Sequence, residues 1–517
     1  MVAKQKGERI VKNLIICTDG TWNDSDSGEE STNVWKIYNA VSEFDSHGVR
    51  QLKYYHPGVG TDPGIVCKLA GGIYGAGLGK HIRSAYKWLC DNYEDGDRIY
   101  MFGFSRGAYT IRSLAGMIGH CGLMIPANDP SDKAEREVWN CVKKIYLECY
   151  RGVKRDDESD DTKCRQRHEN VKIHFLGAWD TVGALGIPDN MAITNLLDNT
   201  DKYRFHDTEL GNHILHARHA LAIDEMRGSY TPTLWNNTQS HPDVVEKWFV
   251  GVHSDIGGGY AENSLSDISL LWMAEEAQKF GLSLDENTLS QTSPDAIGPI
   301  HDSLKGIFSL MRTIPRAIPP LSEADSRERI HHSVMERCGS VSIKYGRYRP
   351  NHTLRPRESV TVDIYTKERW NWTGVYISPG AIYHLEATGG WMDRDIPCNP
   401  DGIDESGFHI SHIAYLSGDM VGKVENIYRK ILKNDNADLR GSKRVENIDW
   451  CVLVGAIANE RNPTADGTPD KMQYFSIDSQ RRIEIERGGY LYAFVNDSWH
   501  FYDNNHGSMK LKITRES

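Results

Sequence analysis

The chain has 517 residues, which is more than one ordinary domain holds and predicts at least two domains. Apolar residues make up 39% and charged residues 25%, a balance that gives a globular protein ample material for a core. The formal net charge of -11 excludes bulk electrostatic binding to nucleic acid, which needs clustered Lys and Arg, and to anionic membranes. We therefore expect no nucleic-acid partner, while a local patch could still contact a membrane surface.

The first residues and the cysteines indicate in which cellular compartment the protein is expected. Lys4, Lys6 and Arg9 are followed by no apolar stretch, so no secretory signal is expected. No run approaches the roughly 18 to 20 apolar residues of a transmembrane helix. The ten cysteines include no C-x-x-C pair, which predicts reduced thiols and neither a zinc site nor a disulfide framework. We expect a protein that is cytoplasmic as synthesised and that leaves its cell only through a specialised secretion system.

Strand-like and helix-like segments alternate through the first 350 residues. The predicted strands are Asn13 to Cys17, Arg98 to Phe104, Val171 to Ala178 and Lys247 to Val252. The predicted helices begin at Val34, at Lys80 and at Arg106, and a further helix is expected to carry His213, His216 and His219 as packing or surface residues. This alternation predicts an α/β fold with a parallel sheet and helices on both of its faces.

Short alternating segments separated by turn residues replace this pattern past about Arg355. They are Val360 to Tyr365, Gly374 to Ile377, Ile382 to Glu386, Cys451 to Ile457, Tyr490 to Phe494 and Met509 to Ile513. Such segments are typical of an antiparallel β-sandwich or barrel. One helix is expected within them, from Gly418 to Lys433. We predict two domains, a catalytic α/β domain over residues 1–355 and a β-sandwich over residues 356–517.

The pentapeptide Gly103-Phe104-Ser105-Arg106-Gly107 lies between a predicted strand and a predicted helix. A nucleophilic serine on a sharp strand-to-helix turn needs small flanking residues, and the helix N-terminus places positive partial charge beside the oxyanion. The pentapeptide alone is a common chance match, equally a glycine-rich turn with an idle serine. Its position after an apolar strand favours Ser105 as the nucleophile of an α/β-hydrolase.

Two polar residues follow later strands in the order that this fold requires. A serine needs a base, and the base needs an orienting acid. Asp180 follows the apolar run that ends at Trp179, and His253 follows the run that ends at Val252. Each alone could be a capping aspartate or a buried histidine. Their joint placement in the order serine, acid, histidine favours catalysis by Ser105, Asp180 and His253.

An oxyanion hole needs two N–H donors. One is expected from Arg106, the residue after the nucleophile, and the second from Gly20 or Thr21 at the end of the first strand. Asp19 is placed to hold that loop or the elbow by hydrogen bonds. Asp-Gly after a strand is also the signature of an ordinary turn.

These motifs resemble those of the type VI secretion phospholipase effectors, a family of uncharacterised and characterised α/β-hydrolase domains. The matching stretches are CTDGTWND (17–24), TNVWK (32–36), GFSRGAYTIR (103–112), GAWDTVGALG (177–186), ARHALAIDEMR (217–227), WFVGVHSDIGGGY (248–260), IHHSVMER (330–337) and YRP (348–350). The resemblance implies a triad of Ser105, Asp180 and His253, phospholipid or another lipid ester as substrate, and no cofactor for catalysis. Supporting roles are implied for Asp224, Glu225, Arg227 and Asp255.

The roles of two further residues and of two apolar segments stay open. His331 and Asp255 are the alternative base and acid. Leu304 to Met311 and Ile314 to Leu321 compare with the lipid-reaching insertions of the family, but they read first as loops or helix ends packed on the core.

The last 160 residues resemble the β-sandwich of small calcium-dependent galactose-binding bacterial lectins. The resemblance rests on GVYISPG (374–380), GGW (389–391) and YAFVNDSWHFYDNNHGS (492–508). It implies a Ca²⁺ site made by Asp497, Asn504, Asn505 and the carbonyls of Tyr376 and Phe501, and oxygen ligands suit Ca²⁺. An Asn-rich turn without metal is the alternative. The stretch DIPCNPDG (395–402) offers no counterpart of the sugar-contacting histidine.

Two functions from different classes follow. The first is a serine hydrolase of carboxylic esters, of phospholipase A type, acting through an acyl-enzyme. The second is a carbohydrate- or partner-binding protein in which the calcium-dependent sandwich carries the function.

Overall fold

The computed structural model of the chain describes residues 11–20, 32–58, 74–126, 131–153, 166–183, 209–305, 312–321, 328–342, 346–403, 442–459, 469, 471–486 and 488–517. Several features singled out in the sequence lie outside these residues: Thr21, the helix expected from Gly418 to Lys433, and most of Leu304 to Met311.

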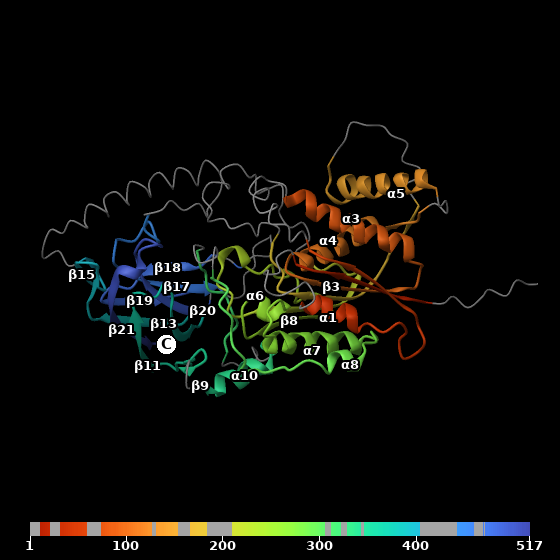
Figure 1. Cartoon of the computed structure of the whole chain (residues 1–517). Helices are drawn as coiled ribbons and strands as arrows, with labels where there is room; N and C mark the ends of the chain where they lie inside the picture. Colours follow the sequence, from red (N-terminus) through yellow and green to blue (C-terminus); the bar gives the residue numbers. More distant parts are fainter. Residues whose placement is uncertain are drawn as a thin grey trace, which may run out of the picture.

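A parallel sheet forms the centre of the first half (Figure 1). Among the described residues it has the order β2-β1-β3-β6-β7-β8, and all neighbouring strands are parallel. The strands are β1 (Asn13–Thr18), β2 (Gln51–His56), β3 (Arg98–Phe104), β6 (Ile173–Trp179), β7 (Ile214–Ala222) and β8 (Val244–Phe249). The winding direction reverses between β1 and β3, and ligands of open parallel sheets bind at the carboxyl ends of the strands beside such a reversal.

Helices cover both faces of this sheet, with α3, α4 and α5 on one side and α1, α7 and α8 on the other (Figure 1). The strand residues alternate between them, as pleated strands require. Leu14 and Ile16 join a core with α3 and α4, whereas Ile15 and Cys17 join a core with α1 and α7. The helices are α1 (Asn33–Ala40), α3 (Tyr74–Asn92), α4 (Arg106–Cys121), α5 (Asp132–Lys144), α6 (His253–Gly257), α7 (Ser264–Lys279), α8 (Glu286–Leu289) and α10 (His332–Gly339).

Short elements complete the first half. They are the helical turns η2 (Ile145–Tyr150) and η5 (Gly228–Tyr230), the strand pair β4 (Leu123–Met124) and β5 (Arg167–His168), and the strand pair β9 (Val341–Ser342) and β10 (Gly346–Arg347). No described helix has both the length and the apolar character needed to cross a bilayer.

Two antiparallel sheets form the second half. One has the order β16-β15-β14-β21-β13-β19, with β11 also paired to β21, and the other has the order β12-β20-β17-β18. The strands are β11 (Ser359–Tyr365), β12 (Asn371–Ile377), β13 (Ile382–Thr388), β14 (Trp391–Asp393), β15 (Ile396–Asn399), β16 (Gly402–Ile403), β17 (Leu453–Asn459), β18 (Gln473–Ser476), β19 (Gln480–Glu484), β20 (Gly489–Val495) and β21 (Asn505–Arg515), with the turn η7 (Tyr502–Asn504) before β21. A common core of alternating side chains, including Ile364, Leu385, Leu453, Leu491 and Leu511, packs between the sheets.

The two halves share a further hydrophobic core. Tyr490 and Phe494 of β20 lie in one cluster with Leu221 of β7 and Trp248 of β8. Arg349, which follows β10, donates to Asp224 just after β7 at 3.0 Å and to the Tyr492 hydroxyl of β20 at 3.4 Å. The sandwich is therefore packed onto the edge of the parallel sheet by apolar contacts and by the hydrogen bond of Arg349.

The predicted fold class is confirmed in both halves, and two local predictions are wrong. The segment with His213, His216 and His219 was expected to be helical, but residues 214–222 form β7 and the last two histidines lie on it. Three histidines spaced for a helix say little, because the apolar run from Ala217 to Ala222 is short enough for a buried strand.

The expectation that the thiols are reduced is wrong for three of the described cysteines and holds for the other five. Cys121 at the end of α4 is joined to Cys149 in η2 by a disulfide, with the Cα atoms 6.2 Å apart, and Cys141 is disulfide-bonded as well. Cys17 and Cys90 are buried free thiols. The pairing was invisible to spacing rules because α4 and η2 meet only through tertiary packing.

Candidate active site

Ser105 occupies a strained turn between β3 and α4. Its φ is 57° and its ψ is -120°, a conformation that non-glycine residues seldom adopt. The backbone N–H of Ser105 donates to the carbonyl of Trp179 at 3.0 Å, and the residue is 7% exposed. Strain of this kind persists only where the surroundings enforce it, and it clusters at functional sites.

The two glycines of the pentapeptide allow the chain to fold back on itself. A Cβ atom on Gly103 would stand 2.6 Å from the carbonyl carbon of Gly107. A Cβ atom on Gly107 would stand 2.0 Å from the carbonyl oxygen of Thr18 at the end of β1. Neither contact is tolerable, so the close approach of α4 to β3 and β1 requires glycine at both positions.

Asp180 and His253 form a buried pair. The Nδ1 atom of His253 lies 2.6 Å from Oδ2 of Asp180, and the two residues are 4% and 0% exposed. Asp180 follows β6 and His253 begins α6 after β8, so both stand at the carboxyl edge that also presents Ser105. Because Nδ1 is bonded to the carboxylate, the Nε2 atom is left to face a serine or a substrate.

Arg316 binds the same carboxylate from the other side. Its guanidinium contacts Oδ1 of Asp180 at 2.5 Å and Oδ2 at 2.9 Å, and it also donates to the carbonyl of Tyr230 at 2.7 Å. The N–H of Ala222 donates to Oδ1 at 3.0 Å. Burial alone would raise the pKa of Asp180, but the charge of Arg316 and the hydrogen bond with His253 outweigh it and hold the pKa well below its ordinary range.

The imidazole of His253 is enclosed by rings and anchored at its backbone. Phe104, next to Ser105, lies over it with ring centroids 4.6 Å apart, and Tyr230 meets it edge-on at 4.9 Å. The backbone N–H of His253 donates to Oε2 of Glu225 at 3.2 Å, and Glu225 is itself paired with Arg227 at 2.8 Å. Burial lowers the pKa of His253 more than Asp180 raises it, so the ring is neutral at pH 7 and able to accept a proton.

The loop after β1 contacts Ser105. A Cβ atom on Gly20 would stand 3.2 Å from Cβ of Ser105. The N–H of Gly20, however, donates to the carboxylate of its neighbour Asp19 at 2.8 Å. The expected donor role of Gly20 is therefore not available in this conformation, and Thr21 lies outside the described residues. Arg106 is the first residue of α4, directly after Ser105.

The side chain of Asp19 ties this loop to its surroundings. Its Oδ2 atom accepts hydrogen bonds from the Thr32 hydroxyl and from the Tyr55 hydroxyl, the latter at 2.9 Å. The loop is therefore fixed against both α1 and β2.

His331 and Asp255, the alternative base and acid, contact different residues. Asp255 bonds His301 at 2.6 Å and the N–H of Val252 at 3.0 Å. His331 contacts the Ser333 hydroxyl at 2.9 Å and stacks on Phe249. Burial and the neighbouring His332 lower the pKa of His331 to about 3, so it caps α10 as a neutral ring. Asp255 supports the turn that carries His253.

Residues 12–276 match the family described as "T6SS, Phospholipase effector Tle1-like, catalytic domain", a match over just more than half of the 517 residues. The chain belongs to this Tle1-like family. The resemblance predicted from the sequence is thereby confirmed for the first half.

Individual relatives are more distant. A curated relative, the uncharacterised protein YEL023C of Saccharomyces cerevisiae, is 26% identical over 441 residues, a match that covers 58% of this chain and 61% of that protein. The chain thus spans about three fifths of the length of the curated relative that it matches.

Three solved structures are similar at low scores. The Tle1 effector bound to the VgrG spike from the type 6 secretion system is 16% identical with a TM-score of 0.33, covering 57% of this chain and 79% of that one. An uncharacterised protein from Pseudomonas aeruginosa is 19% identical with a TM-score of 0.31, covering 55% of this chain and 49% of that one. The EclA N-terminal domain, a PllA-like lectin, is 15% identical with a TM-score of 0.19, covering 30% of this chain and 95% of that one. The fold assignment rests on the observed sheets and not on these scores.

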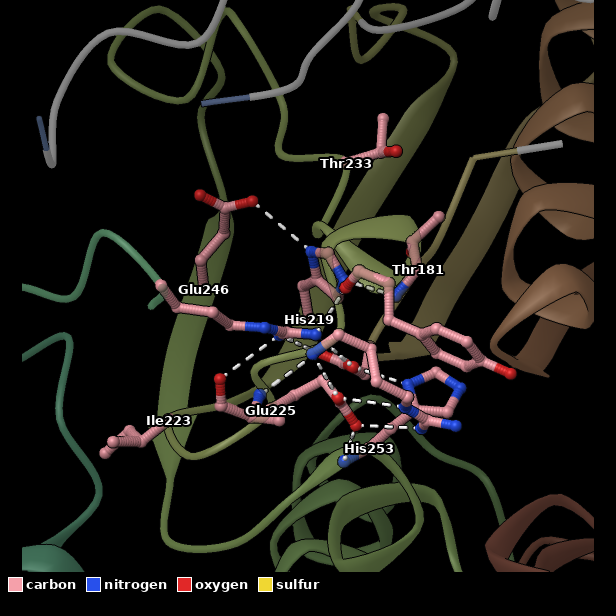
Figure 2. A network of polar contacts seen from close by, with 12 residues as sticks. Thr181, His219, Ile223, Glu225, Thr233, Glu246 and His253 are labelled. Carbon is pink, nitrogen blue, oxygen red and sulfur yellow. Dashed lines mark hydrogen bonds and ion pairs between the residues drawn. The ribbon is translucent and has the colours of Figure 1, made fainter. Parts of the chain in front are cut away.

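His219 is a second buried histidine of this Tle1-like domain (Figure 2). His219 lies between Thr181 and Glu246, accepting the N–H of Thr181 at Nε2 over 3.1 Å and facing Oε1 of Glu246 with Nδ1 over 3.4 Å. Burial lowers its pKa. As an acceptor at Nε2, the neutral ring fixes the backbone directly after Asp180.

The predicted calcium ligands come together only in part. Asn505 donates through its amide to Asp497 at 3.2 Å, and Asn504 precedes it in η7. The carbonyl of Phe501 accepts the N–H of Asn504 at 3.2 Å. Tyr376 is the exception. Tyr376 is in β12 and pairs with Tyr490 of β20. Tyr490 precedes Asp497 by seven residues, which is roughly 20 Å along an extended chain.

The end of β14 takes the place expected for Tyr376. Asp393 pairs with Asn505 across β14 and β21, and the N–H of Arg394 donates to the carbonyl of Asn504 at 3.2 Å. Burial and the charge of Asp393 raise the pKa of Asp497 to about 7. The Oδ1 atoms of Asn504 and Asn505 are buried and accept no hydrogen bond from the described residues. No cluster of three or more His, Cys, Asp or Glu suited to a metal occurs among those residues.

Arg316 is the residue that sequence reasoning missed. It stands in the Pro-rich run that begins at Ile314, which was compared with lipid-reaching insertions and interpreted first as a loop or helix end on the core, and it is 6% exposed. A lone arginine in an apolar run signals a buried charge that needs a carboxylate partner. The sequence does not say which carboxylate.

Proposed function

We propose that the chain is a serine hydrolase of lipid carboxylic esters, of phospholipase A type. Ser105 is the nucleophile, His253 the general base and Asp180 the orienting acid. The observation that carries the proposal is the buried contact of 2.6 Å between His253 and Asp180 beside a strained Ser105. Membership of the Tle1-like family supports phospholipid as the substrate class.

The reaction follows from the groups at the sheet edge. Ser105 Oγ attacks the ester carbonyl while its proton passes to Nε2 of His253, and the N–H of Arg106 faces the resulting oxyanion. Collapse breaks the C–O bond, and His253 returns the proton to the departing alcohol, a lysolipid for a phospholipid substrate. A water molecule then attacks the acyl-enzyme with His253 as base, and the fatty acid leaves as Ser105 is restored.

The charge of Asp180 stabilises the imidazolium that forms in both steps. Its hydrogen bond also holds the proton of the neutral ring on Nδ1, so that the lone pair at Nε2 faces the nucleophile. The neutral resting state of His253, set mainly by burial, is the state that a base needs at pH 7.

A fluorophosphonate probe and phospholipid vesicles test this proposal together. The wild type is expected to be labelled on Ser105 and to release fatty acid and lysolipid, whereas Ser105→Ala loses both, with kcat lower by about 10⁶-fold. Ser113→Ala is the matched control, since Ser113 is a buried serine two turns along the same helix. Full ester hydrolysis by Ser105→Ala would refute the proposal.

A second candidate function concerns the sandwich, where we infer a Ca²⁺ site. Asp497, Asn504 and Asn505, with Asp393 beside them, offer oxygen donors in the set that Ca²⁺ prefers. Two neighbouring carboxylates and two buried amide oxygens without hydrogen bonds favour a cation there. Bound Ca²⁺ would neutralise the acids and fix the loop before β21.

Glycan binding with and without EDTA tests the wider role of this site. Calcium-dependent binding that survives Ser105→Ala would assign a carbohydrate-binding function to the sandwich. Binding that is absent, or unaffected by EDTA, would contradict it.

A further inference from the structure

The segment of residues 312–321 runs between the two halves of the molecule. Most of it has no regular secondary structure, and Ala317, Ile318 and Leu321 are buried in the core that both halves share. Its backbone bonds to the turn after β7, where the N–H of Ile314 donates to the carbonyl of Met226 at 2.7 Å. On this side, the segment is part of the catalytic half.

The sandwich holds the segment near both ends. The indole N–H of Trp370 contacts the carbonyl of Thr313 at 3.0 Å and the Thr313 hydroxyl at 3.1 Å. The N–H of Leu321 donates to the hydroxyl of Tyr490 in β20 at 2.7 Å. These two anchors lie on either side of Arg316.

Arg316 is therefore held from the sandwich and directed into the active site. Its guanidinium makes the two contacts with Asp180 and donates to the carbonyl of Ala222 at 3.1 Å. A fork that binds both oxygens of a carboxylate fixes the plane of that carboxylate as well as its charge. The orientation of Asp180 toward His253 thus depends on where this segment is placed.

We propose that the C-terminal sandwich is a working part of the active site: through Trp370 and Tyr490 it places Arg316 on Asp180. Arg316 is a positioning residue, since it acts on His253 through Asp180. The inference rests on the proposed function of Ser105, Asp180 and His253. It gives the sandwich a role in catalysis that needs neither calcium nor a glycan.

The electrostatic consequence has a definite sign. Arg316 neutralises part of the charge with which Asp180 stabilises the protonated form of His253. Without the guanidinium, that stabilisation grows and the pKa of His253 rises, so activity is lost at a higher pH on acidification. The other charged or titratable groups around the pair are Glu225, Arg227, Tyr230 and His219.

The test measures the titration of His253 in two ways on the full chain. One is the pH dependence of fluorophosphonate labelling, and the other is ¹⁵N NMR of histidine-labelled protein, with His253→Gln to assign the signal. In Arg316→Met, the midpoint is expected to rise by about one unit in both measurements. Arg316→Lys, which keeps the charge but not the fork, is expected to restore most of the midpoint and less of the rate.

The role of the sandwich is tested by paired tryptophan variants. Trp370→Phe keeps the ring and removes its N–H from Thr313, and it is expected to move the midpoint in the same direction by a smaller amount. Trp372→Phe is the control, because its indole donates to the carbonyl of Pro350 at 2.7 Å and not to the 312–321 segment. Tyr490→Phe removes the second anchor.

The outcomes separate the inference from the function on which it rests. Midpoints that stay unchanged in Arg316→Met and Trp370→Phe, with slower rates alone, would overturn it, as would equal effects of Trp370→Phe and Trp372→Phe. If Arg316→Met does not fold, Trp370→Phe and Tyr490→Phe decide in the same way. A wild type that is not labelled on Ser105, while the NMR midpoint still moves, would reject the hydrolase function and keep the positioning role.

Discussion

Buried acids in the two halves of the molecule are partnered in opposite ways. In the catalytic half, both oxygens of Asp180 are bonded, by Arg316, by His253 and by the N–H of Ala222. In the sandwich, Asp497 accepts hydrogen bonds from two neutral donors, the N–H of Ser498 at 2.6 Å and the amide of Asn505 at 3.2 Å, and it faces another acid, Asp393.

The pKa directions express this difference. The pKa of Asp180 is lowered because positive partners outweigh burial, whereas the pKa of Asp497 is raised by burial and by a like charge. The first arrangement is what the proposed triad needs before substrate arrives, and the second, with two neighbouring acids, is what the proposed Ca²⁺ site needs. Four experiments test this difference between the two halves.

The largest effect is expected from Asp180→Asn. The amide still fits the site but cannot hold His253 in the correct tautomer or stabilise its charged form, so kcat should fall by about 10⁴-fold. Ester hydrolysis measures it. Asp95→Asn is the matched control, because Asp95 forms an exposed pair with His168 at 2.7 Å away from Ser105. A loss of less than tenfold would mean that Asp180 has a structural role only.

The next effect concerns the disulfide of the catalytic half. Cys121 and Cys149 close a loop of 28 residues, and losing that link should cost about 3 kcal/mol of stability. Hydrogen exchange of Cys121→Ser should show faster opening of α4 and η2 and unchanged protection in β20 and β21. Equal loosening of both halves would show that they unfold as one unit.

Calcium should act on the other half alone and more strongly at high pH. Asp497 holds its proton up to a pKa of about 7 in the folded chain, so without metal its contribution lowers the stability as pH rises from about 4 to about 7. Ca²⁺ needs the ionised form. At a concentration a hundredfold above Kd, Ca²⁺ should add about 2.7 kcal/mol.

Thermal melts at pH 5 and pH 8, with Ca²⁺ and with EDTA, measure this difference. The shift in Tm should be larger at pH 8, and Asp497→Asn should abolish it. A shift that is equal at both pH values, or that survives Asp497→Asn, would place the metal elsewhere.

The smallest effect is the pH dependence of hydrolysis near neutrality. Burial keeps the pKa of His253 below its ordinary value, so kcat/KM should change by less than about threefold between pH 7 and pH 8 and fall only below about pH 6.5. EDTA should leave this profile unchanged. A profile that still rises steeply above pH 7 would contradict a neutral resting His253.

The sequence predicted the parts of the site that belong to strand ends. Ser105, Asp180 and His253 each follow an apolar run, and the carboxyl ends of parallel strands meet at one edge, so local pattern and topology were enough to predict that all three lie at this edge. The need for Gly103 and Gly107 could also be predicted, because the turn around Ser105 has no room for larger residues.

Features that depend on tertiary packing were not readable. Arg316 reaches Asp180 from a segment without regular structure, and the disulfide joins Cys121 to a cysteine in a neighbouring helical turn. Tyr376 was placed at the metal by likeness to a short motif, whereas the register of β12 with β20 puts it at the far end of the strand. The N–H of Gly20 was assigned from its position after β1, and only the structure shows that Asp19 accepts it.

The core shared by the two halves also constrains how such proteins evolve. A sandwich attached by a linker can be exchanged or lost between relatives at little cost. Here Leu221 and Trp248 of the catalytic sheet are covered by Tyr490 and Phe494, and losing the sandwich would expose them to water. We expect family members without a sandwich to carry polar residues or a substitute cover at these positions, so the two halves should be inherited together.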